Sequence, residues 1–265
     1  MSLADFLDFR LFFLAGLVFV PLERLFAARK DQPALRRHWK NDLVYVFANG
    51  LVIRLGLTGL MILALAGSPL LVPSGWQEAV QAQPLWLQAV EVLIIADLIF
   101  YFFHRLFHAV PALWRIHQIH HSIDEMDWLA AHRIHPLDQI LTKGASLLPC
   151  FALGFSGWAI GLYAFAYHWH TLFLHANVRF GLGPLRWLLT SPDFHHWHHC
   201  REREAWDRNF GTQLALWDFV FGTAHLPQGR HAERFGIGEP VPESYPAQLL
   251  HPFRRQGSEA VPETG

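Results

Sequence analysis

Histidine is the residue type in this sequence whose number and spacing could support chemistry. The sequence holds 18 histidines among 265 residues, and 14 of them lie between His104 and His199. The nitrogen of a neutral imidazole is a good ligand for iron, copper, zinc and nickel. The clustering therefore predicts a metal centre in the middle third of the chain.

Three histidine clusters have a spacing that suits helices. His104 and His108 form an HxxxH pair, and a helix with 3.6 residues per turn places both on one face. Residues 117–121 and 195–199 each read HxxHH, so the first and last histidines of each motif are again four residues apart. His120 points about 100° away from His121 around a helix and could reach a second ion.

The number of histidines also bears on how many ions are bound, and which. Eight or more imidazoles exceed the four positions of one tetrahedral zinc ion, so we expect two ions. Two redox-active ions can build, from O2 and two electrons, a species that attacks an unactivated C–H bond, whereas zinc has no redox step. We therefore expect two iron ions, with O2 as co-substrate, and would interpret zinc in a purified sample as a surrogate.

Apolar segments predict that the elements positioning these histidines are membrane helices. Hydrophobic residues make up 52% of the chain and charged residues only 16%. Residues 43–66 and 85–103 are each long enough to cross a bilayer core of about 30 Å, and residues 6–26 could do so if tilted. We predict an all-α integral membrane fold with about three spanning helices. The net charge of −1 gives no basic field that would attract nucleic acid, so no nucleic-acid partner is expected.

Charge and turn signals predict the topology. The loop after the first segment is basic and the loop at 67–84 has no lysine or arginine, so the first loop should be cytoplasmic. His104 then emerges on the same face. A turn signal at 154–157 predicts that residues 145–175 form a helical hairpin, complete or re-entrant, which returns His175 to that face. Residues 104–144 and 176–265 would form a cytoplasmic helical cap, making 1–265 a single membrane domain in a bacterial inner membrane.

The motifs resemble the signature of the sterol desaturase and fatty acid hydroxylase superfamily. The resemblance begins with the run from Asp97 through His104 and His108 and continues through Pro111, Trp114 and residues 117–122. Further motifs follow in order at 133–137, 175–177, 191–199, 209–211 and 217–223. The resemblance covers residues 97–223. It implies a membrane oxygenase with a cytoplasmic di-iron centre that hydroxylates or desaturates a lipid taken from the bilayer.

The resemblance also implies a ligand set, with one departure from the family pattern. The implied ligands are His104, His108, His117, His120, His121, His175, His195, His198 and His199. Fatty acid 2-hydroxylases of this superfamily have an HxxxH pair before the last cluster, but Thr171 stands four residues before His175. His170 stands five before it, so either a local bulge recruits His170 or the site has one ligand fewer.

Other residues near the motifs have competing interpretations. His135 precedes Pro136 and is a ligand, a substrate-side residue or a structural hydrogen bonder. Asp97 lies two helical turns before His104 and is expected to orient an imidazole, the alternative being an ion pair with an arginine. Asn209 is expected either to support the ligands or to cap a helix. His196 should point away from the metal face, and His132 and His168 have ordinary structural explanations.

The sequence also limits the partners and the alternative functions. It contains no dinucleotide, haem or flavin motif and only two cysteines, so electrons must come from a separate ferredoxin or cytochrome with its reductase. The basic stretch 29–40 could dock such a carrier. A histidine-rich metal transporter would place ionisable residues along several spanning helices, and a zinc hydrolase would need an HExxH motif. A non-catalytic metal-binding relative is a further alternative.

Overall fold

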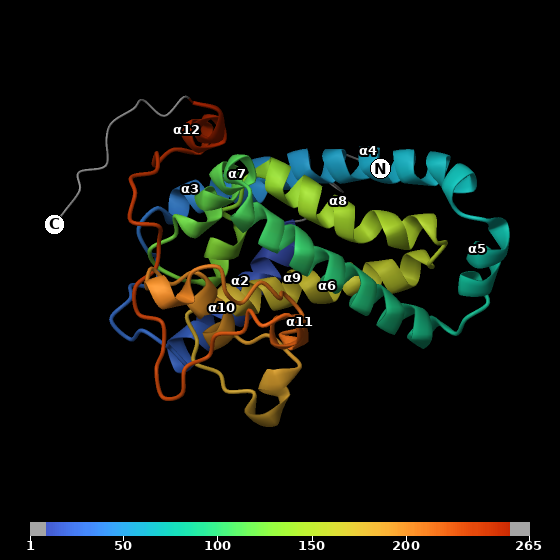
Figure 1. The fold of residues 1–265 in the computed structure, drawn as a ribbon. Helices are drawn as coiled ribbons and strands as arrows, with labels where there is room; N and C mark the ends of the chain where they lie inside the picture. Colours follow the sequence, from blue (N-terminus) through green and yellow to red (C-terminus); the bar gives the residue numbers. More distant parts are fainter. Residues whose placement is uncertain (1–8, 255–265) are drawn as a thin grey trace.

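The computed structural model describes residues 9–254, apart from the side chains of Phe9, Ser68 and Pro69, and consists of helices joined by loops (Figure 1). No β-strand forms within these residues, where strand-like pairing is limited to three isolated bridges. The predicted all-helical fold is therefore confirmed for the described residues. The longer elements are α2 (Phe9–Leu25), α4 (Gly50–Leu71), α6 (Leu85–Ala109), α8 (Pro136–Ala152) and α9 (Gly157–His175).

Shorter elements gather mostly at one end of the long helices (Figure 1). They are α3 (Trp39–Val44), α7 (Pro111–His121), η2 (Trp128–His132), η3 (Gly183–Trp187), α10 (Pro192–His198), η4 (Arg203–Ala205), α11 (Leu216–Val220), α12 (Tyr245–Leu250) and η5 (His251–Phe253). We call this end the cap. A π-helical turn, η1 (Tyr45–Asn49), joins α3 to α4, and α5 (Ser74–Gln81) lies at the opposite end of the molecule.

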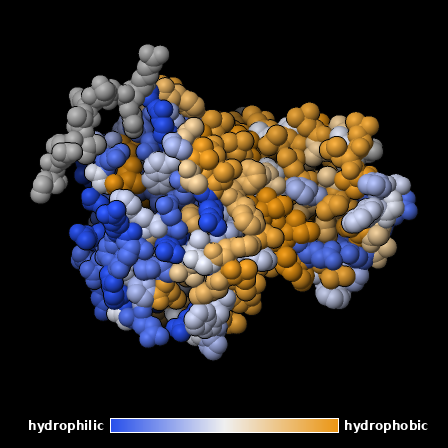
Figure 2. Space-filling model, viewed as in Figure 1, coloured by the Kyte–Doolittle hydropathy of each residue, from blue (hydrophilic) through white to orange (hydrophobic). Residues whose placement is uncertain are grey.

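Two helices are long and apolar enough to cross a bilayer. They cover Trp39–Gly67 and Leu85–Ala109, and contain the predicted spans 43–66 and 85–103. Residues 6–8 of the other predicted span lie outside the described residues, and α2 itself has 17 residues, so a third span stays a prediction. Apolar residues dominate the visible surface of the long helices, whereas hydrophilic residues cover much of the cap (Figure 2). This distribution suits a membrane body with an aqueous cap.

The predicted hairpin is present, although its first arm is longer than expected. Helices α8 and α9 are joined by residues 153–156, where Gly154 adopts a left-handed φ of 83° and the Ser156 hydroxyl accepts from the Ala159 N–H. The turn at 154–157 is thus confirmed. Helix α8 begins at Pro136, because proline is favourable in the first helical turn. Residues 136–144, which we assigned to the cap, are therefore part of the hairpin.

Glycines allow α4 and α8 to pack closely. A Cβ atom on Gly56 would lie 2.5 Å from the Ile140 side chain, and one on Gly144 would lie 2.7 Å from Leu60. Small residues at such interfaces let two helix backbones approach. Helix α8 also packs against α6, which in turn packs against α9. This arrangement brings the last turn of α6 and the last turn of α9 to the cap.

A buried network of ion pairs joins the residues on either side of η2 to α3, at the start of the candidate span Trp39–Gly67. Arg36 contacts Asp42 at 2.5 Å and Asp127 at 2.7 Å, and Arg133 contacts the same Asp42 at 2.6 Å. Arg36 is only 1% exposed, so it does not contribute to the basic surface predicted for residues 29–40. Paired charges of this kind are tolerated in a protein interior because each is matched. The network fixes Arg133, whose carbonyl contacts a histidine of the site.

Candidate metal centre

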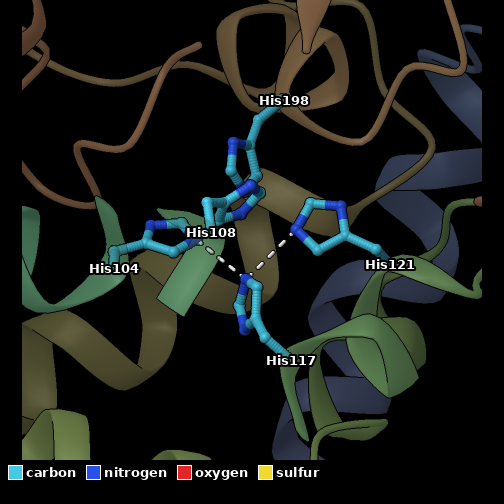
Figure 3. A group of neighbouring side chains, drawn as sticks. All are labelled: His104, His108, His117, His121 and His198. Atoms are coloured by element: carbon cyan, nitrogen blue, oxygen red, sulfur yellow. Dashed lines mark hydrogen bonds between the residues drawn. The ribbon is translucent and has the colours of Figure 1, made fainter. Parts of the chain in front are cut away.

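Nine histidines converge at the cap in two groups, and they are the nine that the motifs implied. The first histidine group contains His104, His108, His117, His121 and His198, and the second contains His120, His175, His195 and His199. Within each group, the candidate ligand nitrogens all lie within 4.8 Å of one another. The rings of the first group point toward a common centre (Figure 3). Each group can therefore hold one metal ion.

Helical spacing explains how the motifs divide between the groups. In α7, His117 and His121 belong to the first group, whereas His120 belongs to the second, as its position around the helix predicts. The motif at α10 divides the other way: His195 and His199 belong to the second group, and His198 belongs to the first. Helix α6 contributes the other two histidines of the first group, and α9 contributes the other histidine of the second group.

Backbone carbonyls fix the tautomers of four of these histidines. A carbonyl oxygen can only accept a hydrogen bond, so an Nδ1 bonded to it must carry the proton and leave a lone pair on Nε2. The Nδ1 atoms lie 2.7–3.1 Å from their carbonyl partners. The pairs are His104 with Phe210, His120 with Arg133, His175 with Thr171, and His198 with Arg208. All four rings thus offer Nε2 as a metal ligand.

The Nε2 atoms face one another in a way that hydrogen bonds cannot explain. The Asp138 carboxylate accepts from Nδ1 of His117 at 2.6 Å, so His117 also has an Nε2 lone pair. Its Nε2 lies 3.1 Å from Nε2 of His104, and His120 and His175 face each other at the same distance. Two lone pairs at this distance repel unless a cation lies between or beside them. Both groups therefore suit a metal ion.

Unpaired ring nitrogens lead to the same conclusion. Among the described residues, Nε2 of His108 and Nε2 of His198, both in the first group, are buried without a hydrogen-bond partner. Buried polar atoms in folded proteins are almost always paired, because an unpaired one costs about 1–3 kcal/mol. Metal coordination would pair these nitrogens, and with the facing Nε2 atoms of both groups the residues present fit a dinuclear centre.

Burial keeps these imidazoles in the protonation state that binds metal. It lowers the pKa of His117 to about 3. Burial, together with the neighbouring imidazoles, also lowers the pKa values of His120, His121, His198 and His199 well below the usual 6.5. Only a neutral imidazole has a free lone pair. The site is therefore ready for a cation at neutral pH without first releasing protons.

Asn209 holds the loop that presents two of the carbonyls. Its backbone is left-handed, with φ of 59°, and its neighbours Arg208 and Phe210 direct their carbonyls at His198 and His104. The Asn209 side chain donates to the carbonyls of Phe194 and His225 and accepts from the His225 N–H. Asn209 thus connects the loop to α10 and orients two first-group ligands through its flanking peptides, which favours the supporting role over helix capping.

Asp97 acts on the same loop rather than on an imidazole. Its carboxylate accepts from the N–H groups of Gln213 and Leu214, both at 2.9 Å, and from the Trp217 indole at 3.1 Å. The predicted bond from Asp97 to a ligand ring is therefore wrong. From its position in α6, the Asp97 side chain faces the loop that follows α10. Its carboxylate accepts three hydrogen bonds from that segment.

His135 and His170 lie outside both histidine groups. His135 caps α8 by accepting from the Leu137 N–H, and its Nε2 donates to the Leu249 carbonyl at 3.2 Å. The ring of His170 is occupied by the Gln213 side chain at 3.2 Å and the Thr190 carbonyl at 3.0 Å. No bulge brings His170 to the second group, which fits the hypothesis of one ligand fewer. His196 faces Phe235, away from the metal face, as predicted.

The sequence interpretation missed Asp138. This residue lies in the first turn of α8, where an acidic side chain commonly stabilises a helix N-terminus, so its position alone does not distinguish a structural role from support of a ligand. The signal that could have found it is its place directly after the motif at 133–137.

A cavity of about 440 Å³ gives access to both histidine groups. It is lined by His108, His121, His198 and His199, with Trp114 and Trp206 beside them. Trp206 is 59% exposed, so the cavity borders the surface of the cap. Small molecules can therefore reach both groups from this side.

Comparison with known proteins shows the family of the region that contains the two histidine groups. The family model for fatty acid hydroxylase matches residues 89–223, about half of the chain, and this region contains all nine histidines. The chain belongs to the fatty acid hydroxylase family. The resemblance found in the motifs is thereby confirmed.

Several relatives of this fatty acid hydroxylase family member are lipid-modifying enzymes. The chain is 32% identical to ornithine lipid hydroxylase OlsE of Rhizobium tropici over 67% of this chain and 54% of that protein. It is 35% identical to alkylglycerol monooxygenase of Homo sapiens over 55% of this chain and 32% of that protein. Methylsterol monooxygenase 1 of Rattus norvegicus is 26% identical over 80% of this chain and 72% of that protein.

The family member spans about half the length of the ornithine lipid hydroxylase and about a third of the alkylglycerol monooxygenases. No solved structure shows a significant match to the chain.

Proposed function

We propose that this chain is a membrane-bound, O2-dependent di-iron oxygenase that hydroxylates or desaturates a C–H bond of a lipid. The observation that carries the proposal is the convergence of nine imidazoles in two groups, with lone pairs directed inward. The relatives that are named hydroxylases and monooxygenases support the same chemistry. Two iron ions held by these groups would supply the two-electron chemistry by which O2 oxidises carbon.

The chain's own residues position and protect the site. Asp138 and the carbonyls of Phe210, Arg133, Thr171 and Arg208 hold Nδ1 protons, which fixes the ring orientations. Such outer contacts make a ligand more basic and keep it in place. The cavity beside the first and second histidine groups would admit O2 and the reacting part of the lipid.

Electrons would come from a separate protein of the ferredoxin or cytochrome type, with its reductase. Cys150 and Cys200 are both free and buried, and two thiols do not make a four-cysteine iron–sulfur site. The exposed part of the basic stretch 29–40 is a candidate docking surface for an acidic carrier. We propose that the cap lies on the cytoplasmic face of a bacterial inner membrane.

The transporter alternative is less well supported. The nine histidines gather at the cap, and the two that fall within a candidate span, His104 and His108, lie in its last turns rather than along it, where a permeation path would need them. The non-catalytic alternative predicts bound metal without lipid oxidation, and a lipid analysis can test it.

The decisive experiment compares lipid extracts from cells that express the wild-type chain, His198→Ala or His196→Ala. His198 is a first-group histidine, whereas His196 is its neighbour in α10 outside both groups, so it is a matched control. Mass spectrometry should show a lipid that gains one oxygen atom or loses two hydrogen atoms with the wild type and with His196→Ala only. The same product from His198→Ala, or no product from any of them, would argue against the proposal.

A further inference from the structure

A second cavity, of about 420 Å³, lies among α2, η1, α4, α8 and α9 and shares no residue with the two histidine groups. Leu11 and Phe12 of α2 and Leu51, Ile53 and Leu57 of α4 line one side of it. Leu11 is 40% exposed on the outer apolar surface of the long helices. The cavity therefore borders the surface that faces the bilayer in the proposed membrane arrangement.

Arg54 of α4 lines this cavity and is already engaged in another interaction. Three further basic side chains line the opposite side. They are His132 of η2, Lys143 of α8 and His168 of α9, and the rings of the two histidines lie 6.1 Å apart. Among the described residues, no hydrogen bond or ion pair engages the side chains of these three, and no aspartate or glutamate lines the cavity. Three N–H donors thus face the cavity without an acceptor.

Lys143 is the unusual member of this set. It is one of three lysines in the sequence; Lys30 lies before the first candidate span, and Lys40 is the second residue of that span. Helix α8 packs against both α4 and α6, the helices that contain the two candidate spans. Lys143 stands seven residues into α8, about 10 Å from its cap end at 1.5 Å per residue. An ionisable residue so placed normally has a charged partner or a functional role.

The contacts that Lys143 does make are weaker than an ion pair. Its ammonium lies 5.0 Å from the centre of the Tyr167 ring, a cation–π contact worth about 0.5–2 kcal/mol. The nearby Asp138 carboxylate accepts from His117 at 2.6 Å and forms no ion pair with Lys143 among the described residues. Lys143 therefore has no carboxylate at ion-pair distance among the described residues, and the cavity has room for one.

We infer that this cavity binds the carboxylate head of a long-chain amphiphile that enters from the bilayer. Lys143 would supply the counter-charge, His132 and His168 would donate hydrogen bonds, and the alkyl chain would lie among the apolar side chains of α2 and α4. Lys143 is the single permanent cation of the three, because an ordinary imidazole with a pKa near 6.5 is mostly neutral at pH 7 and above. One positive charge matches a carboxylate better than a phosphate monoester, which carries nearly two negative charges.

The cavity lies against the second histidine group but is separate from it. Thr171 lines the cavity, and its carbonyl accepts from Nδ1 of His175 at 2.8 Å. None of the nine ligand histidines lines this cavity. The inference therefore goes beyond the proposed oxygenase function and needs no metal to be tested.

The test measures binding of spin-labelled stearic acid to metal-free protein in a neutral detergent, by electron paramagnetic resonance. We expect saturable binding, seen as an immobilised spectral component. Lys143→Met should weaken binding at least tenfold because it keeps the alkyl stem without the charge, and Lys143→Arg should retain it. Lys40→Met is the matched control, since Lys40 also lies over an aromatic ring, Trp39, but is exposed outside the cavity. This control should bind as the wild type does.

Three outcomes would overturn the inference. They are equal binding by the wild type and Lys143→Met, equal binding of the matching long-chain alcohol, and tighter binding of an alkyl phosphate. If Lys143→Met fails to fold, the double variant His132→Gln/His168→Gln keeps the test valid, with binding expected to weaken several-fold. Because all arms use metal-free protein, failure here is distinguishable from failure of the lipid-oxidation experiment.

Discussion

The carboxylate of Asp138 lies 2.6 Å from Nδ1 of His117, and the opposite nitrogen of that ring lies 3.1 Å from Nε2 of both His104 and His121. Asp138 is 2% exposed, so water does not compete for its contact with the ring. A buried carboxylate in this position makes the imidazole a stronger donor to a cation and fixes its orientation. His117 is thus the first-group ligand whose strength depends on a buried acidic side chain.

Replacing Asp138 with asparagine should weaken metal binding at the first histidine group. The amide can donate to Nδ1, which favours the tautomer with a proton on Nε2 and blocks that ligand. Loss of such an outer contact typically costs 10–100-fold in metal affinity, and we expect an effect of about that size. Competition with a chelator would measure it. Asp193→Asn is the control, because Asp193 pairs with His231 outside both groups; equal metal retention by the two variants would contradict the prediction.

Asn209 allows its backbone role to be separated from its side-chain role. Asn209→Gly keeps the left-handed φ but loses the side-chain hydrogen bonds, whereas Asn209→Ala loses both. Both variants should lose first-group metal, and the alanine variant should be less stable by about a further 1 kcal/mol. Metal content and thermal unfolding measure the two effects. Full metal content in both variants would mean that Asn209 does not position Arg208 and Phe210.

The same substitution should lower the metal content at His175 but leave it unchanged at His170. His175→Gln removes a second-group ligand, so metal content should fall from about two ions per chain toward one. His170→Gln removes a ring that contacts Gln213 and Thr190 only, so metal content should stay near two. Elemental analysis of protein prepared anaerobically with iron gives the answer. A loss of one ion from His170→Gln would restore His170 as a ligand.

Asp97→Asn should destabilise the protein because it places an amide where three N–H donors meet. At least one donor then faces an NH2 group, and a buried unsatisfied donor costs about 1–3 kcal/mol in free energy of unfolding. Thermal unfolding in detergent would detect the loss. Glu91→Gln is the control on the same helix, since Glu91 accepts one hydrogen bond from Gln83. A similar stability for both variants would rule out Asp97 as the anchor of the loop.

Metal removal should lower the melting temperature. The facing Nε2 atoms in both groups favour the bound state, and a ligand present at 100 times its Kd stabilises the folded state by about 2.7 kcal/mol. Adding ferrous iron to chelated protein should restore the original melting temperature. His175→Gln/His198→Gln should show a much smaller response, because each group then lacks a ligand.

The sequence predicted which histidines converge and where the main helices lie because both depend on local spacing. The divergence of His120 from His121 follows from helix geometry, and the hairpin turn at Gly154 follows from glycine. The partners of the ligands were not predictable in the same way. The carbonyls of Arg208 and Phe210 belong to the backbone, so no residue type marks them, and the placement of Asp97 depends on how a distant loop packs.

The two HxxHH motifs contribute unequally to the two histidine groups, and this imposes an order on assembly. Four of the five first-group ligands lie between His104 and His121, within α6 and α7, whereas the second group has a single member before α9. As the chain is synthesised, the first group is almost complete once α7 has formed. The second group needs His175, at the end of α9, and the histidines at α10, all of which are synthesised more than fifty residues after His121. The last ligand of each group comes from α10, so docking of this one short helix completes both halves of the centre at once.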